Sequence, residues 1–166
     1  MQVQSIEKSD FIKLEGSRQV IAHDYARKFA LLDLGNSLGC YGLSWRSNLV
    51  EPIIELSPDR QIIWIGVDQQ LAAISLYQGR ICVSLTLNTN ILQIIQVDKL
   101  IAVLAEDEVL LFNLDSSIRL IKGLPSLAEE IFVENTNLVI RLLEGDSLTL
   151  DPQLGTLKLS EPKFSH

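Results

Sequence analysis

Short apolar runs alternate with polar turn residues along most of this 166-residue chain. The runs are rich in isoleucine, valine and leucine and are too short for helices, so the pattern predicts β-strands. The clearest example extends from residue 91 to residue 121, where the charged turn Glu106-Asp107-Glu108 separates two of the runs. Four strands joined in order by tight turns predict one antiparallel sheet. The expected strands of this stretch are Ile91–Gln96, Leu100–Ala105, Val109–Leu114 and Ile118–Ile121.

The same four-strand pattern occurs four times. Its anchor leucines Leu34, Leu76, Leu114 and Leu150 stand 42, 38 and 36 residues apart, and the segment Arg18-Gln19-Val20-Ile21 reappears as Arg60-Gln61-Ile62-Ile63. A period near 40 residues, built from strands, is typical of a β-repeat array in which each unit packs on its neighbours.

We therefore expect one all-β domain of four tandem four-stranded antiparallel repeats. It spans residues 10–160, with repeats at about 10–48, 49–88, 89–125 and 126–160, a polar lead-in at 1–9 and a tail at 161–166. The strands expected in the first repeat are Phe11–Leu14, Val20–His23, Lys28–Leu34 and Cys40–Trp45. Those of the second are Pro52–Leu56, Gln61–Val67, Gln70–Leu76 and Arg80–Leu85, and those of the fourth are Glu130–Glu134, Asn137–Leu143, Ser147–Leu150 and Thr156–Leu159.

Several strands are apolar on both faces, among them Ile62–Ile65 and Leu100–Leu104. A sheet between two neighbouring sheets requires this, whereas a sheet with one wet face does not. The pattern predicts a small β-propeller or an open array of blades. An open array would leave apolar faces at its ends, so two chains could pair as a homodimer through their terminal repeats.

The segment from Leu150 to Leu157, with the sequence LDPQLGTL, resembles the hairpin between the third and fourth strands of quinoprotein-type and WD-repeat-like β-propellers. In such a hairpin the aspartate side chain caps the turn, and the glycine supplies the positive φ that the tight return requires. Residues 76–80 and 114–118 are weaker versions of it. The chain lacks the Trp-Asp and Gly-His dipeptides of those families, and no quinone-binding or calcium-binding residues can be carried over. The resemblance therefore implies a fold and no activity.

Charge and hydropathy narrow the range of partners. The net charge is −7, and residues 61–166 carry most of it, so we expect no binding to the phosphate backbone of nucleic acids. We interpret Arg18, Arg27 and Lys28 as a solvated basic face. The apolar runs are too short to span a membrane, and the charged first ten residues do not look like a secretion signal. We expect an acidic cytoplasmic protein that does not associate with membranes.

No familiar constellation of catalytic or metal-binding residues is present in the sequence. The only histidines are His23 and His166, and Cys40 and Cys82 occupy the same place in successive repeats, which predicts buried thiols on equivalent strands. We attribute the carboxylates at turns to turn chemistry and solubility. These residues are Asp68, Glu106, Asp107, Glu108, Glu144 and Asp146. We predict no catalytic residue, no metal and no cofactor, and hence a protein that is not an enzyme.

One segment combines residue types that are enriched in binding hot spots. Tyr41, Trp45 and Arg46 lie near a connection between repeats, and Tyr25 lies in the preceding turn, so the four form a candidate patch for a protein partner. The alternative is that Trp45 packs between the first two repeats. The function we expect is a non-enzymatic protein-interaction module. A small-molecule sensor or enzyme is the alternative, with a site in a central cavity or at a dimer junction that uses turn carboxylates and His23.

Overall fold

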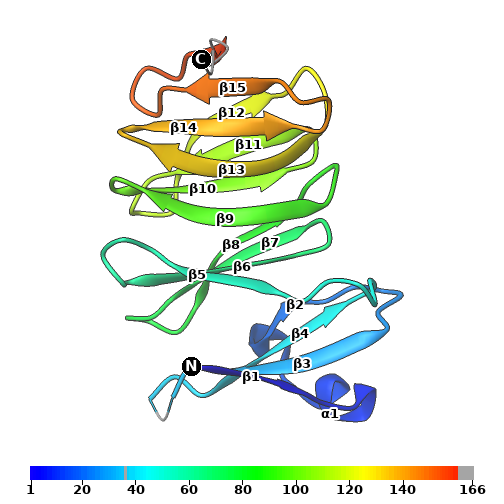
Figure 1. Cartoon of the computed structure of the whole chain (residues 1–166). Helices are drawn as coiled ribbons and strands as arrows, with labels where there is room; N and C mark the ends of the chain where they lie inside the picture. Colours follow the sequence, from blue (N-terminus) through cyan, green and yellow to red (C-terminus); the bar gives the residue numbers. More distant parts are fainter. Residues whose placement is uncertain (36, 161–166) are drawn as a thin grey trace.

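The computed structural model describes residues 1–35 and 37–160, and these form an all-β chain with four four-stranded sheets, named A to D here (Figure 1). The expected tail, 161–166, and His166 lie outside the described residues. In spatial order, sheet A consists of β1 (Gln2–Ser5), β3 (Lys28–Asp33), β4 (Cys40–Trp45) and β2 (Gln19–Ile21). Sheet B consists of β5 (Ile53–Leu56), β6 (Ile62–Val67), β7 (Gln70–Ser75) and β8 (Ile81–Thr86). Sheet C consists of β9 (Ile91–Val97), β10 (Leu100–Ala105), β11 (Glu108–Phe112) and β12 (Ile118–Gly123). Sheet D consists of β13 (Ala128–Glu134), β14 (Asn137–Leu142), β15 (Ser147–Leu150) and β16 (Leu157–Leu159).

Sheets B, C and D confirm the predicted pattern, since each pairs four consecutive strands in antiparallel, up-and-down order. Several of their hairpins turn through two residues, of which the first has a left-handed backbone. These first residues are Asp68, Asp98 and Asn135, with φ of 52°, 50° and 57°. Aspartate and asparagine tolerate this conformation better than other residues with side chains. The polar residues between the apolar runs therefore set the register of each sheet.

Sheet A differs from the expectation. The strand predicted over Phe11–Leu14 is wrong, because helix α1 (Lys8–Ile12) begins before it and a 3-10 turn follows at Gly16–Arg18. The edge strand β1 comes instead from the expected lead-in and pairs with β3, while β2 pairs with β4 in parallel. One pair of strands in sheet A is thus parallel, although the all-β repeat fold itself is confirmed.

The two cysteines show the effect of this rearrangement. Cys40 begins β4, which lies inside sheet A between β3 and β2, whereas Cys82 lies on β8, at the edge of sheet B. The prediction of buried thiols on equivalent strands is therefore wrong. Both cysteines are free thiols, Cys40 partly buried and Cys82 exposed. Cys40 and Cys82 are 42 residues apart in the sequence, but this spacing does not give them equivalent positions in the two sheets.

The core lies between neighbouring sheets. Sheet B buries both of its faces: Ile63 and Ile65 pack with sheet A, while Trp64 packs with sheet C and lies 4.5 Å from the ring of Phe112. Sheet C is likewise covered on both faces, by sheet B and by sheet D. The strands that lack alternation in the sequence are therefore the ones packed on both sides, as predicted.

The four sheets do not close into a ring, and sheets A and D lie at opposite ends of the molecule (Figure 1). Helix α1 covers the outer face of sheet A, where the ring of Phe11 lies 5.6 Å from that of Phe29. The side-chain amide of Gln19 fixes this segment by donating to the carbonyl oxygens of Phe11 and Leu14, at 3.3 and 3.1 Å. The array is therefore open, and α1 protects its first face.

The outer face of sheet D is mostly polar. Its strands alternate, so that Ile140 and Leu148 pack towards sheet C while Arg141 and Thr149 point outward. The Arg141 guanidinium pairs with the Glu130 carboxylate at 2.7 Å, and the hydroxyl groups of Thr149 and Ser160 are bonded at 2.7 Å. A polar outer face is what a terminal unit of a repeat array needs in water. No helix in the described part of the chain is long and apolar enough to cross a membrane.

Candidate functional site: a polar pocket between the first two sheets

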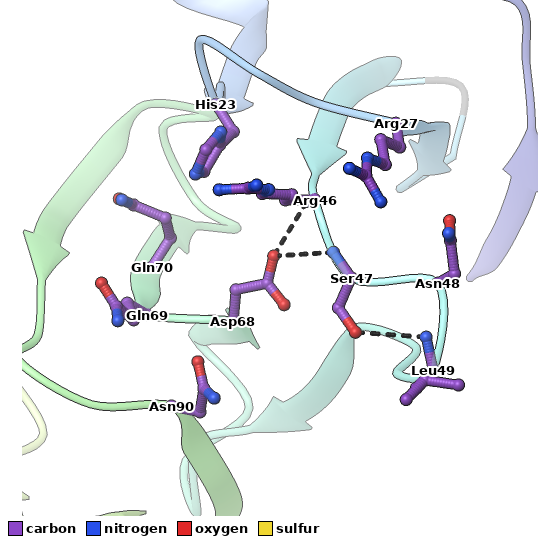
Figure 2. Close-up of a pocket in the computed structure, with 10 residues that line it drawn as sticks. All are labelled: His23, Arg27, Arg46, Ser47, Asn48, Leu49, Asp68, Gln69, Gln70 and Asn90. Atoms are coloured by element: carbon purple, nitrogen blue, oxygen red, sulfur yellow. Dashed lines mark hydrogen bonds between the residues drawn. The ribbon is translucent and has the colours of Figure 1, made fainter.

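A pocket of about 590 Å³ opens where the loops of sheets A and B meet (Figure 2). Four segments distant in sequence build it: the loop from β2 to β3, the connection from β4 to β5, the turn from β6 to β7, and the connection from β8 to β9. Most of the residues that line it have polar or charged side chains. The residues that line it are His23, Arg27, Arg46, Ser47, Asn48, Leu49, Asp68, Gln69, Gln70 and Asn90.

Asp68 holds two walls of this pocket together. Its carboxylate accepts hydrogen bonds from the backbone amides of Arg46 and Ser47, at 2.8 and 3.2 Å (Figure 2). Its own backbone carbonyl accepts a further bond from the amide of Ile91, at 2.7 Å. The β6–β7 turn therefore ties the connection that enters sheet B to the strand that begins sheet C.

His23 is fixed on the opposite side of the pocket. Its backbone amide donates to the hydroxyl of Ser44 at 3.0 Å, and its ring nitrogen Nδ1 accepts from the backbone amide of Tyr25 at 3.0 Å. An accepting Nδ1 assigns the proton of the neutral ring to Nε2. Tyr25 itself is 76% exposed and lies beside the pocket, with its ring edge-on to the imidazole at 6.5 Å.

Arg27 and Arg46 bring two guanidinium ions to the pocket. Their main chains are held firmly: the amide of Arg27 donates to the carbonyl oxygen of Trp45 at 2.8 Å, and the amide of Arg46 donates to Asp68. Both side chains are exposed, and within the described residues neither guanidinium group makes an ion pair or a hydrogen bond. The two arginines are therefore anchored through their main chains, while their guanidinium groups face solvent without a partner among the described residues.

The structure divides the four residues expected in the partner patch. Arg46 lines the pocket and Tyr25 flanks it, whereas Trp45 and Tyr41 are 4% and 0% exposed in the core between sheets A and B. Trp45 Nε1 donates to the carbonyl oxygen of Val50 at 3.2 Å. The Tyr41 hydroxyl donates to the carbonyl oxygen of Gly79, and the Arg18 guanidinium lies 4.6 Å from the centre of the Tyr41 ring. The two buried aromatic residues support the surface that Arg46 and Tyr25 present.

From the sequence, Asp68 was expected at a site only as one of the turn carboxylates of the alternative small-molecule site, and Arg27, Asn90 and the glutamines were not expected at a site. Asp68 was assigned to turn chemistry, which is part of its role, but its hydrogen-bond partners lie 21 and 22 residues earlier in the chain. Only the packing of sheet A on sheet B brings them together. The local signal that could have drawn attention to Asp68 is an aspartate at the first position of a two-residue hairpin turn, where its backbone is left-handed.

The pocket offers cationic and amide groups as contacts for binding. Among the described residues that line it, Asp68 is the one carboxylate, and it already accepts from two backbone amides. No group of three or more histidine, cysteine, aspartate or glutamate residues in the described chain is placed to hold a metal ion. The arrangement can present cations and amide groups to an incoming molecule.

Known proteins resemble this chain in fold and not in sequence. No protein family and no curated protein matches it. Among solved structures, the N-terminal domain of Nup159 superposes with a TM-score of 0.50 at 13% identity, over 86% of this chain and 42% of that one. This neighbour is a β-propeller. The chain has a β-propeller-type repeat fold.

A second solved structure, HIRA(644-1017), superposes with a TM-score of 0.47 at 10% identity, over 96% of this chain and 53% of that one. The chain thus spans about half, or less, of the length of the structures it matches. The β-propeller-type likeness concerns the arrangement of the sheets, so it transfers no partner and no residue role.

Proposed function

We propose that this chain is a non-enzymatic protein-interaction module of the β-propeller type, and that its binding surface is the pocket between sheets A and B together with Tyr25. One observation carries the proposal: Arg27 and Arg46 are fixed at their main chains but unpaired at their guanidinium groups. Tyrosine and arginine on a rigid base are the residues that contribute most to protein interfaces. The exposed Tyr25 extends the same surface.

A small-molecule sensor or enzyme is the second candidate. The observation that favours it is the pocket volume, which falls within the range of about 300–1,000 Å³ that ligand sites have. His23, which the sequence analysis suggested for such a site, does line the pocket. The imidazole has no carboxylate partner there, and Nδ1 is occupied by the amide of Tyr25. Protein binding therefore agrees better with the geometry. A location in the cytoplasm stays a prediction.

A pull-down tests the proposal with one pair of matched variants. The tagged full chain, Tyr25→Ala and Tyr77→Ala are used to capture proteins from a lysate of the host cell, and the captured proteins are identified by mass spectrometry. Tyr77 is the control because it is 85% exposed but follows β7, at the opposite end of that strand from the pocket. We expect one stoichiometric partner that the wild type and Tyr77→Ala retain and Tyr25→Ala loses.

Two outcomes would contradict this proposal. Recovery of the bait alone would argue against a protein partner, and a panel of metabolites in thermal-shift assays would then test the small-molecule candidate, since a ligand of the folded state raises the melting temperature. Equal capture by the two tyrosine variants would move the binding surface away from the pocket.

A further inference from the structure

The charge inside the pocket is opposite to the charge of the protein. The chain as a whole carries −7, but the pocket brings together the guanidinium ions of Arg27 and Arg46. A guanidinium ion keeps its charge at every pH at which proteins fold. The single carboxylate in the lining, Asp68, points to the backbone amides of Arg46 and Ser47 and not to either guanidinium group. The pocket therefore presents a local positive charge.

The two arginines reach the pocket from neighbouring strands. Arg27 precedes β3 and Arg46 follows β4, and Lys28 pairs with Trp45 at the adjoining end of the ladder. The Arg27 amide closes this end of the ladder by its bond to the Trp45 carbonyl oxygen, at 2.8 Å. Two planar guanidinium groups that start side by side can each donate two hydrogen bonds to the oxygens of one carboxylate, in the forked geometry that arginine favours.

The remaining lining decides what kind of molecule would carry the anion. Asn48, Gln69, Gln70 and Asn90 supply amide groups that can donate to and accept from a peptide backbone. Leu49 is the one large aliphatic residue in the lining, and it is 94% exposed, so the pocket does not offer the row of aliphatic side chains that a hydrophobic helix would need. The lining suits a polar segment in extended conformation.

We propose that the pocket binds an acidic segment of a partner protein, in which aspartate or glutamate carboxylates pair with Arg27 and Arg46 while the amide side chains contact its backbone. This inference rests on the proposed function and specifies its partner. The net charge of −7 limits the occupant to a short acidic segment, because any long polyanion, a nucleic-acid strand included, would meet the acidic remainder of the protein.

Fluorescence anisotropy with labelled peptides tests the inference on the full chain. The probes are hexaglutamate, hexaglutamine and a six-nucleotide oligothymidine, each measured at low and at high salt. The variants are Arg27→Gln, Arg46→Gln and the double variant. Arg80→Gln is the matched control, since Arg80 is exposed, precedes β8 and lies outside the lining of the pocket. Melting temperatures of all variants are measured first to confirm that each is folded.

We expect hexaglutamate to bind the wild type with a Kd of about 1 mM or below and hexaglutamine to bind more weakly. Each single substitution at Arg27 or Arg46 should weaken hexaglutamate binding about two- to fivefold, as exposed ion pairs do, and the double variant more. Salt should weaken it further, and Arg80→Gln should bind as the wild type does.

The inference fails if hexaglutamate does not bind, if hexaglutamine binds equally well, or if Arg80→Gln loses as much affinity as Arg46→Gln. It also fails if oligothymidine binds more tightly than hexaglutamate and depends on the same arginines, which would make the pocket a nucleic-acid site. These failures are distinct from failure of the proposed function. A partner that is lost with Tyr25→Ala but retained by the double arginine variant would leave the binding surface in place and remove only the acidic occupant.

Discussion

The carboxylate of Asp68 accepts from the backbone amide of Arg46 at 2.8 Å, across the junction of the first two sheets. Asp107 makes a corresponding contact one sheet later, where its carboxylate accepts from the Thr89 hydroxyl at 2.8 Å. In sheet B, therefore, the β6–β7 turn holds the β4–β5 connection, which leads into that sheet. In sheet C, the β10–β11 turn holds the β8–β9 connection in the same way. Turn carboxylates of this chain join neighbouring units as well as shaping their own turns.

Replacing Asp68 should weaken this junction. We expect Asp68→Ala to lower the free energy of unfolding by about 1–3 kcal/mol more than Asp98→Ala does, because the charged acceptor of two amides is lost. Asp98 is a suitable reference because its φ of 50° is close to the 52° of Asp68, so the backbone strain that alanine introduces is similar at both positions. The Asp98 carboxylate has no hydrogen-bond partner among the described residues. Urea denaturation measures both variants. Equal losses would mean that the two amide bonds contribute nothing.

Trp45 should be essential for folding rather than for contact with a partner. We expect Trp45→Ala to destabilise the protein by about 3–5 kcal/mol, because the indole is 4% exposed between sheets A and B and its removal leaves a cavity. Tyr25→Ala, at a 76% exposed site, should change stability by less than about 0.5 kcal/mol. Chemical denaturation of the two variants checks this contrast, and a folded Trp45→Ala with wild-type stability would contradict it.

Gly42 should be required for the cover over the outer face of sheet A. A Cβ at this position would lie 2.5 Å from Leu14 Cδ1 and 2.9 Å from the Phe11 ring. We expect Gly42→Ala to cost about 1–3 kcal/mol through overpacking and to expose α1 to proteases. Gly123→Ala is the control, because a Cβ there meets no atom within 4 Å. Limited proteolysis that cuts both variants equally at residues 8–14 would argue against this packing role.

The raised pKa of Glu108 predicts that replacing this residue changes the stability of the protein in a pH-dependent way. Burial, and secondarily the neighbouring Asp107 carboxylate, raise this pKa above its ordinary value of 4.5. The folded state therefore binds the proton more tightly than the unfolded chain does, and ionisation costs stability as the pH rises through and above that value. We expect Glu108→Gln to be slightly more stable than the wild type at pH 7 and to lose this advantage below the ordinary pKa.

Asp115 is a control whose pKa is shifted in the opposite direction, downward. Hydrogen bonds from the hydroxyl and the backbone amide of Ser117 lower the pKa of its carboxyl group below 3.8. Its stabilising contribution is present above that value and disappears as the pH falls through the lowered pKa. Asp115→Asn should therefore be the less stable protein at pH 7. Thermal unfolding from pH 3 to pH 7 checks both signs, and a Glu108→Gln advantage that grows on acidification would contradict the first.

The end faces lead us to expect a monomer. The homodimer that the sequence left possible requires apolar faces on the terminal repeats, but α1 covers sheet A, and sheet D presents Arg141, Glu130 and Thr149 beside a partly exposed Phe132. Burying that charged pair in an interface would cost desolvation energy. Light scattering coupled to size exclusion measures the mass directly, and a concentration-independent dimer would restore pairing through the ends.

Local signals predicted sheets B, C and D well, because each strand is a compact apolar run with its own turn. Sheet A could not be predicted in the same way. Its edge strand β1 is wholly exposed and lacks an apolar face, and the parallel placement of β2 depends on contacts with residues about 20 positions away. Residue type singled out Arg46, which lines the pocket, and Tyr25, which is exposed beside it. Aromatic residues occur in cores and interfaces alike, so the burial of Trp45 and Tyr41 could not be told from their type.

The open arrangement also bears on how such a protein can change in length. A closed propeller fixes its number of blades, because adding one alters every angle around the ring. Among residues 1–35 and 37–160, the core clusters join each sheet to its sequence neighbours, and α1 is a separate cover at one end. A duplicated sheet between C and D would meet on both sides the kind of face it already fits, and every residue that lines the pocket precedes sheet C. Evolution or design could therefore lengthen this molecule one sheet at a time and leave the pocket between sheets A and B unchanged.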